Sequence, residues 1–126
     1  MKEKQLQDIT ALYGRLSRDD EVGGESMSIQ SQRAILGQYA KEHGFTNCQF
    51  FMDDGYSGTN FDRPAFTEMM ELVEQRRVRT IIVKDLSRLG RNYLEVGRYT
   101  EVIFPENKVR FIAITDGVDS AAGDNE

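Results

Sequence analysis

The chain has 126 residues and a formal net charge of −5, from 16 Lys and Arg against 21 Asp and Glu. That length fits a single domain with its own core. The acidic balance argues against a freestanding nucleic-acid-binding domain, because such domains carry a net basic surface. The single cysteine excludes an intrachain disulfide, and no apolar run reaches the roughly 18 residues of a membrane helix. We therefore expect one cytoplasmic domain that binds no membrane.

Short apolar segments alternate with segments of helical periodicity along the chain. Strands are predicted at 9–13, 48–52, 80–83 and 109–114, and helices at 28–43, 64–77 and 88–104, the last one closed by Pro105. This alternation implies right-handed crossovers between parallel strands. We predict an α/β fold in which a mostly parallel, flavodoxin-like sheet, four-stranded or slightly larger, has helices on both faces.

The single domain is expected to span residues 9–119. Residues 1–8 are polar and are predicted to form a flexible lead-in. The acidic, glycine-rich segment 18–25 and the segment 116–126 are predicted to be mobile. The last part of the latter, 120–126, is assigned as a flexible tail, so the chain is expected to end without a closing helix.

Polar residues follow three of the predicted strands. Arg15 and Ser17 follow the first strand. Asp53 and Asp54 follow the second, and the segment Lys84–Arg91 follows the third. Open α/β sheets bind ligands at the carboxyl ends of their strands, so arginines from separate segments are predicted to converge there with a serine on one anion. Because arginine binds phosphate oxygens bidentately, this combination favours phosphoryl transfer over acyl transfer.

Three of the arginines also have purely structural interpretations. Arg88 and Arg91 are predicted to share one face in the first turn of a helix, where cations oppose the helix dipole by roughly 0.3–1 kcal/mol each. A phosphate bound at that helix end would reverse the sign, whereas a pair between Arg91 and Glu95 would be only structural. Arg63 lies at another helix start, where it either serves the site or pairs with Asp62, itself a candidate cap.

Arg15 and Gln32 are polar residues in apolar surroundings. Arg15 ends a predicted buried strand, where an unpaired guanidinium would be costly, so it requires either a carboxylate or a phosphate as its partner. Gln32 interrupts an apolar helix face one turn after the helix begins. It is either a satisfied buried amide or a residue of the site.

Other catalytic schemes lack the residues they need. The segment 55–59 misses the last glycine of a nucleophile elbow, and the single histidine, His43, is expected to cap a helix. No phosphate-binding or dinucleotide-binding glycine motif follows a strand. Cys48 has no companions at the spacing of a zinc site. The sequence therefore predicts neither a metal nor a cofactor.

In order and spacing, the polar segments resemble the catalytic domain of serine site-specific recombinases, the resolvase/invertase family, over about residues 9–119. The resemblance rests on five segments: Tyr13-Gly14-Arg15-Leu16-Ser17, Ser28-Ile29 with Gln32, Asp54 followed by Ser57-Gly58, Asp62-Arg63-Pro64, and Leu86-Ser87-Arg88-Leu89-Gly90-Arg91. The first and last segments are specific in combination. The last resembles most the large serine recombinases and transposases of mobile genetic elements.

The resemblance implies a bacterial, cytoplasmic DNA recombinase for transposon excision or integration. Such an enzyme cleaves and rejoins DNA through a covalent 5′-phosphoserine, without metal or ATP. The resemblance implies Ser17 as the nucleophile and four arginines as phosphate ligands, namely Arg15, Arg63, Arg88 and Arg91. The supporting positions it implies are Tyr13, Gln32, Asp54, Ser87 and Asp85.

One position departs from the small resolvases, which have an aspartate where this chain has Ser87. If that aspartate protonates the leaving hydroxyl, the role passes to Asp85 or is dispensed with. The family also implies double-stranded recombination sites as partners, bound by dimers and tetramers of the full-length protein. Because the chain stops before the long family helix of the dimer interface, we expect these residues alone to be inactive and monomeric or weakly dimeric.

A second function is compatible with the same residues. In a receiver-like or anion-binding signalling module of this topology, Asp53, Asp54 and Lys84 would bind Mg²⁺ and accept a phosphoryl group. The position of the acidic pair, after the second strand instead of the first, argues against it.

Overall fold

The computed structural model describes residues 8–17 and 28–121. The predictions for a lead-in over 1–7, a mobile segment over 18–25 and the last residues of the tail, 122–126, lie outside this part of the chain. Within the described part, no helix combines the length and the apolar character needed to cross a membrane.

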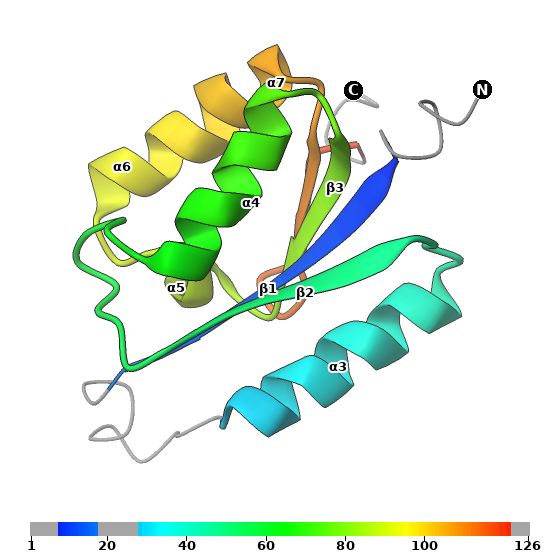
Figure 1. Cartoon of the computed structure of the whole chain (residues 1–126), viewed down its shortest axis with the longest axis horizontal. Coiled ribbons are helices and arrows are strands. Elements are labelled where there is room, and N and C mark those ends of the chain that lie inside the picture. The colour runs from blue at the N-terminus through cyan, green and yellow to red at the C-terminus, as the bar shows by residue number, and fades with distance from the viewer. Residues whose placement is uncertain (1–7, 18–27, 122–126) are drawn as a thin grey trace.

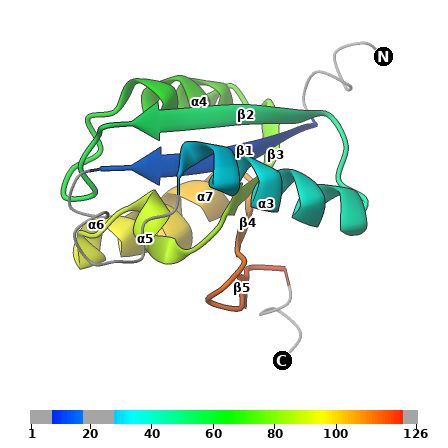
Figure 2. The same ribbon diagram turned by 90° about the horizontal axis from the view of Figure 1, so that it is seen from below.

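Five strands of the described residues form one sheet in the order β2-β1-β3-β4-β5. In chain order they are β1 (Ile9–Leu16), β2 (Cys48–Asp54), β3 (Val78–Val83), β4 (Arg110–Ala113) and β5 (Val118–Asp119). The first four are parallel, and β5 is antiparallel to β4. This is the flavodoxin-like order, so the predicted fold class is confirmed. The arrowheads of β1 and β2 lie at the same end of the sheet (Figure 2).

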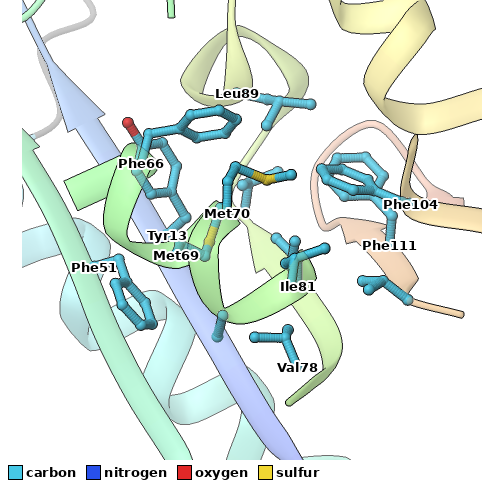
Figure 3. Close-up of a cluster of buried hydrophobic side chains, with 14 of the residues drawn as sticks. Tyr13, Phe51, Phe66, Met69, Met70, Val78, Ile81, Leu89, Phe104 and Phe111 are labelled. Carbon is cyan, nitrogen blue, oxygen red and sulfur yellow. The ribbon is translucent and has the colours of Figure 1, made fainter. Parts of the chain in front are cut away.

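Helices cover both faces of the sheet, as predicted (Figure 1). Helix α3 (Ile29–Glu42) packs on one face and buries Leu36 and Ala40 in a small cluster with Leu12 of β1. Helix α4 (Pro64–Glu74) packs on the other face, in a larger cluster that includes Tyr13, Phe66, Met69, Met70 and Phe111 (Figure 3). The two sets alternate along β1, because successive strand residues point to opposite faces.

Helix α3 begins and ends where the sequence predicts. The Ser28 side chain accepts a hydrogen bond from the Ser31 amide at 3.0 Å and so caps the first turn. His43 is the C-cap, and its ring Nδ1 lies 2.9 Å from the Tyr39 carbonyl oxygen. Gly44 follows with a φ of +77°, a backbone conformation that favours glycine.

The prediction of one helix over 88–104 is wrong. That region contains α5 (Leu86–Leu89), α6 (Tyr93–Arg98), a π-helical turn η1 (Tyr99–Ile103) and α7 (Phe104–Glu106). The chain leaves the helical conformation at Gly90, and Asn92 then caps α6 by accepting from the Glu95 amide at 3.2 Å. The elements α6, η1 and α7 follow one another without a gap, so helical backbone continues past Pro105 and ends at Glu106, one residue later.

The prediction of a mobile segment starting at residue 116 is also wrong for its described part. Strand β5 pairs with β4, and Asp119 forms an ion pair with Arg110 at 2.7 Å. The Ser120 amide donates to the Phe111 carbonyl at 2.9 Å, and the Phe111 amide donates to the Ser120 hydroxyl at 3.0 Å. These polar cross-strand contacts fix a segment that has too few apolar residues to be recognised as a strand.

Candidate active site

Arg15 is fully buried at the carboxyl end of β1, an inner strand of the sheet. Its guanidinium donates to three main-chain carbonyl oxygens: Nε to that of Arg88 at 3.3 Å, Nη1 to that of Tyr56 at 3.1 Å, and Nη2 to that of Ser87 at 2.5 Å. The sequence suggests a carboxylate or a phosphate as its partner. The described residues provide carbonyl groups, which satisfy the guanidinium and join two separate segments, the loop after β2 and α5, to β1.

Arg88 completes a reciprocal contact between α5 and β1. It is buried, and its Nη1 donates to the Arg15 carbonyl oxygen at 3.2 Å. Each of the two arginines therefore binds a main-chain carbonyl of the other, since the Arg15 Nε donates to the Arg88 carbonyl. Two guanidinium groups are held together in this way at the end of the sheet, where a phosphate would bring the compensating negative charge.

Asp85 organises the segment that carries Arg88. Its carboxylate accepts from the Ser87 hydroxyl at 2.7 Å and from the Arg88 amide at 3.1 Å, which caps α5. Lys84 Nζ lies 3.3 Å from the second carboxylate oxygen. Burial disfavours the charged carboxylate, but the Ser87 hydrogen bond and the charges of Arg88 and Lys84 outweigh it, so the pKa of Asp85 lies below its ordinary value.

Gln32 holds the main chain of Arg15 from the first turn of α3. Its Nε2 donates to the Arg15 carbonyl at 3.0 Å, and its Oε1 accepts from the Arg15 amide at 3.1 Å. A fully buried amide thus acts like one residue of an additional strand. A Cβ at Gly14 would lie 2.6 Å from Gln32 Oε1, so this close approach requires glycine there. Gln32 is therefore both a satisfied buried amide and a neighbour of the site.

Ser17 lies just beyond the end of β1 and is only 7% exposed. Tyr13 and Arg15 alternate with residues of the opposite face within β1, so their side chains lie on the same face, and Ser17 follows Arg15 by two residues. The carbonyl of Leu16 accepts from the amides of Gly55 and Tyr56 at 2.6 and 3.2 Å. The loop after β2 is thereby held against the main chain next to Ser17.

Arg63 belongs to a second polar network on the same face of β1. It is buried at the start of α4, where its Nη1 donates to the Tyr13 hydroxyl at 3.0 Å and its Nε to the Asn60 carbonyl at 3.0 Å. Its guanidinium carbon lies 4.5 Å from the ring centre of Phe61 and 5.3 Å from that of Phe66. Its Nη2 is buried without a hydrogen-bond partner among the described residues.

The Tyr13 hydroxyl connects Arg63 to the buried Asp53, which the sequence assigns only to the receiver-like alternative and not to the recombinase site. Tyr13 donates to Asp53 at 2.7 Å. Asp53 also accepts from the amides of Ala65 and Phe66, at 2.8 and 2.9 Å, and so caps α4 in place of Asp62. Burial, followed by the Asp53 contact, raises the pKa of Tyr13 despite the opposing effect of Arg63, so the hydroxyl stays protonated.

Asp54, the acidic residue predicted to support the site, is exposed at the end of β2, whereas its neighbour Asp53 is buried. Consecutive strand residues face opposite sides, so the two carboxylates do not form the acidic pair that a receiver-like site requires. Lys84 pairs with Asp85. No three His, Cys, Asp or Glu side chains of the described residues lie close enough together to hold a metal ion.

Arg91 is separated from Arg88 by the break at Gly90, so the two do not share one helix face as predicted. Arg91 is exposed, whereas Arg88 is buried. The Arg91 amide donates to the Gly58 carbonyl at 2.6 Å, and Glu95 pairs with Arg98 at 3.5 Å. A Cβ at Gly58 would lie 2.7 Å from Arg15 Nη2 and 2.9 Å from Arg91 Cγ, so the loop touches both arginines.

A groove of about 830 Å³ lies beside this site but differs from it in chemistry. Its walls come from α6, η1, β4 and β5 and are mainly apolar, with Leu94, Val96, Phe111 and Val118 among the lining residues. Arg91 is also one of its lining residues. The convergence of polar side chains that a phosphate requires lies at the end of β1 and not in this groove.

The comparisons with known proteins agree with this arrangement. Residues 10–126 match the family model "Resolvase, N terminal domain". The N-terminal catalytic domain of TP901-1 integrase has 27% sequence identity and a TM-score of 0.77, covering 90% of this chain and 82% of that one. A resolvase family site-specific recombinase from Streptococcus pneumoniae has 28% identity and a TM-score of 0.72, covering 90% and 76%.

Two further relatives come from mobile elements. The C-terminal catalytic domain of ISC1926 TnpA, an IS607-like serine recombinase, has 25% identity and a TM-score of 0.67, covering 83% of this chain and 67% of that one. An uncharacterized immunity region protein 3 of Bacillus phage phi105 is 30% identical over 64 residues, which are 51% of this chain and 77% of that protein. By its family match and its fold, this chain belongs to the resolvase family, as a catalytic domain of the serine site-specific recombinases.

Proposed function

We propose that Ser17 is the nucleophile with which this domain cleaves DNA. The Ser17 oxygen attacks a backbone phosphorus and forms a Ser–O–P bond, while the bond from phosphorus to the 3′ oxygen breaks. The serine hydroxyl loses its proton and the leaving 3′ oxygen gains one. A 3′ hydroxyl of the exchanged strand then reverses these changes. One P–O bond replaces another at each step, so rejoining needs no external energy source.

The observation that carries the proposal is the position of Ser17, buried just past the end of β1 and two residues after Arg15, which is joined to Arg88 by reciprocal hydrogen bonds. Arg15, Arg88, Arg91 and Arg63 supply the positive charge that stabilises the phosphate as charge develops on its oxygens. Direct contact with Arg15 requires that phosphate oxygens replace carbonyl groups as its acceptors. The unpartnered Nη2 of Arg63 is a donor available for the same purpose.

Ser87 and Asp85 are assigned a positioning role. The lowered pKa of Asp85 keeps its carboxylate ionised at neutral pH, which disfavours it as the acid that protonates the leaving 3′ oxygen. The carboxylate instead orients Ser87 and caps the turn that carries Arg88. Asp54 is exposed and is proposed only as an outer acidic position beside the site.

The proposed partners are the double-stranded recombination sites of a mobile element, bound by dimers and tetramers of the full-length protein in the cytoplasm of a bacterium. The integrase and the IS607-like recombinase among the relatives support a role in integration or excision. The 126 residues alone are expected to be inactive and at most weakly dimeric.

Covalent capture of DNA tests the proposal. Full-length protein is incubated with nicked fragments of the genomic DNA around its own coding sequence, digested with nuclease and protease, and examined by mass spectrometry. We expect a nucleotide on the peptide that contains Ser17, lost in Ser17→Ala and retained in Ser31→Ala, a matched change on the exposed face of α3. Adducts on another residue, or no adduct at all, would contradict the proposal.

A further inference from the structure

The turn that follows β4 is bonded to the segment that carries Ser87 and Arg88. The Ile114 amide donates to the Val83 carbonyl at 3.0 Å. Thr115 donates to the Lys84 carbonyl twice, from its amide at 2.9 Å and from its hydroxyl at 3.1 Å. These contacts continue the pairing of β3 with β4 past the ends of both strands, up to the start of α5.

Asp116 makes the last contact in this series and the only one of them that uses a carboxylate. It accepts a hydrogen bond from the amide of Leu86, the first residue of α5, at 2.6 Å. Amides in the first turn of a helix have no partner within the helix. Asp85 satisfies the amide of Arg88, so two carboxylates from distant parts of the sequence cap the same short helix.

Contacts with the rest of the domain matter for α5 because the helix is too short to be stable by itself. It has four residues, and isolated helices are marginal in water below about 12 residues. Its carbonyl groups at Ser87 and Arg88 accept from the guanidinium of Arg15, and its Arg88 side chain binds the Arg15 main chain. A shift of α5 would therefore displace both arginines at once.

We propose that Asp116 is a positioning residue of the active site: by accepting from the Leu86 amide it holds α5, and through α5 it holds Arg88 and Arg15 in place for the phosphate. This inference rests on the proposed function of those arginines. It makes the turn after β4 part of the site, although this turn contributes no side chain to the phosphate.

Three variants of the full-length protein test the role. Asp116→Ala removes the acceptor, whereas Asp116→Asn keeps a side-chain oxygen that caps helices as well as aspartate does. Asp119→Ala is the matched control, because it removes from the same hairpin a carboxylate that pairs with Arg110 of β4. The rate of adduct formation at Ser17 is measured at saturating DNA, together with DNA affinity and hydrogen exchange at the Leu86 amide.

We expect Asp116→Ala to slow adduct formation about tenfold, in line with the loss of a helix cap, at unchanged DNA affinity. Exchange at the Leu86 amide should be faster by a similar factor. Asp116→Asn should stay within about twofold of the original protein in both measurements. If Asn were as slow as Ala, or if Asp119→Ala caused the same loss, the positioning role would be overturned.

The exchange measurement separates this inference from the proposed function. If the original protein formed no adduct at Ser17, the proposed function would fail, while the Leu86 amide would still report on the Asp116 contact. If exchange at the Leu86 amide were then faster in Asp116→Ala and in neither of the other two variants, the result would show that the Asp116 contact holds α5 in place. Unchanged exchange in that variant would overturn the inference whatever the adduct assay showed.

Discussion

At the scale of single residues, this domain is unusual in burying arginines at the end of its sheet. Arg15 and Arg63 are almost completely buried, although removing a guanidinium from water is costly unless its donors are satisfied. Arg15 meets that requirement with carbonyl groups of three residues, and Arg63 meets it in part with Tyr13, Asn60 and aromatic rings. These partners hold positive charge at the proposed phosphate site before DNA arrives.

The Tyr13 hydroxyl is the only group that joins Asp53 to Arg63 in the described contacts, so we predict that Tyr13→Phe destabilises the domain. The change leaves a second donor of buried Arg63 unsatisfied and removes a hydrogen bond to Asp53. A loss of about 1–3 kcal/mol in the free energy of unfolding is expected, measured by urea denaturation. Tyr93→Phe, at a side chain that is 87% exposed, should change it by less than about 0.5 kcal/mol. Equal losses in both variants would contradict the prediction.

At the scale of elements, the site depends on two short connecting segments in which a glycine leaves room for a neighbouring side chain. The loop from β2 to α4 passes Gly58, where a Cβ would lie 2.7 Å from Arg15 Nη2. The break between α5 and α6 passes Gly90, where a Cβ would lie 2.7 Å from Phe61 Cζ and 3.3 Å from Arg63 Nη2. Neither glycine has a φ in the range that favours glycine. Glycine is required at these positions because Arg15 approaches Gly58 closely and Phe61 approaches Gly90 closely.

We predict that Gly58→Ala impairs catalysis more than folding. The added methyl group must displace Arg15 from its carbonyl partners, and a misplacement of about 1 Å at a catalytic group can cost about 100-fold in rate. The rate of adduct formation at Ser17 in the full-length protein measures this loss.

Gly37→Ala is the control. Gly37 lies inside α3, and a Cβ there would lie 3.7 Å from Cζ of Phe50 in β2, which is an ordinary van der Waals contact. It should leave the rate unchanged and stabilise the domain by roughly 0.5–1 kcal/mol. Adduct formation by Gly58→Ala at the rate of the original protein would show that Arg15 need not keep its position.

At the scale of the whole molecule, the net charge of −5 hides an uneven distribution. The acidic composition argues against nucleic-acid binding, yet the chain belongs to a family of DNA recombinases. Net charge is a sum over the surface, whereas a phosphate responds to the charges within a Debye length of it, about 8–10 Å. Arg15, Arg63, Arg88 and Arg91 gather at the carboxyl end of the sheet, where Asp53 and Asp85 also lie, whereas Glu42 of α3 and Glu68, Glu71 and Glu74 of α4 are exposed on the helices.

The two faces of the sheet are also unequal, and we predict that they open at different free energies. Helix α4 buries four apolar side chains, those of Phe66, Met69, Met70 and Val73, whereas α3 buries Leu36 and Ala40 with Gln32. Each fully buried large side chain contributes about 1.5–3 kcal/mol. Native-state hydrogen exchange should therefore show α3 opening at a free energy lower by about 2 kcal/mol or more. Equal protection of the two helices would contradict this.

Several elements could be predicted from local patterns, and others could not. The apolar runs that became β2 and β3, the Ser28 cap and the proline at the start of α4 are signals within a few residues of the element they mark. The break between α5 and α6 could not be predicted, because the apolar spacing continues across Gly90. Strand β5 was missed because it is held by polar contacts with β4.

The choice between Asp53 and Asp54 shows the same limit at the site. The resemblance implies Asp54 as the supporting acidic position, and a shift of one residue along a strand moves a side chain to the other face. Only the fold shows that Asp53 is the buried one, bonded to Tyr13 and to the start of α4. No signal near Asp53 in the sequence indicates this, since Tyr13 lies 40 residues away.

The sequence by itself determined the alternation of the first four strands with helical segments and the residue types at the strand ends, because periodicity and turn chemistry act over a few neighbouring residues. The tertiary structure alone decided which groups each of these residues binds. The contacts of Arg15 with Ser87 and of Asp116 with Leu86 span 72 and 30 residues. Such contacts depend on the register and packing of whole elements, which fix distances that no local pattern encodes.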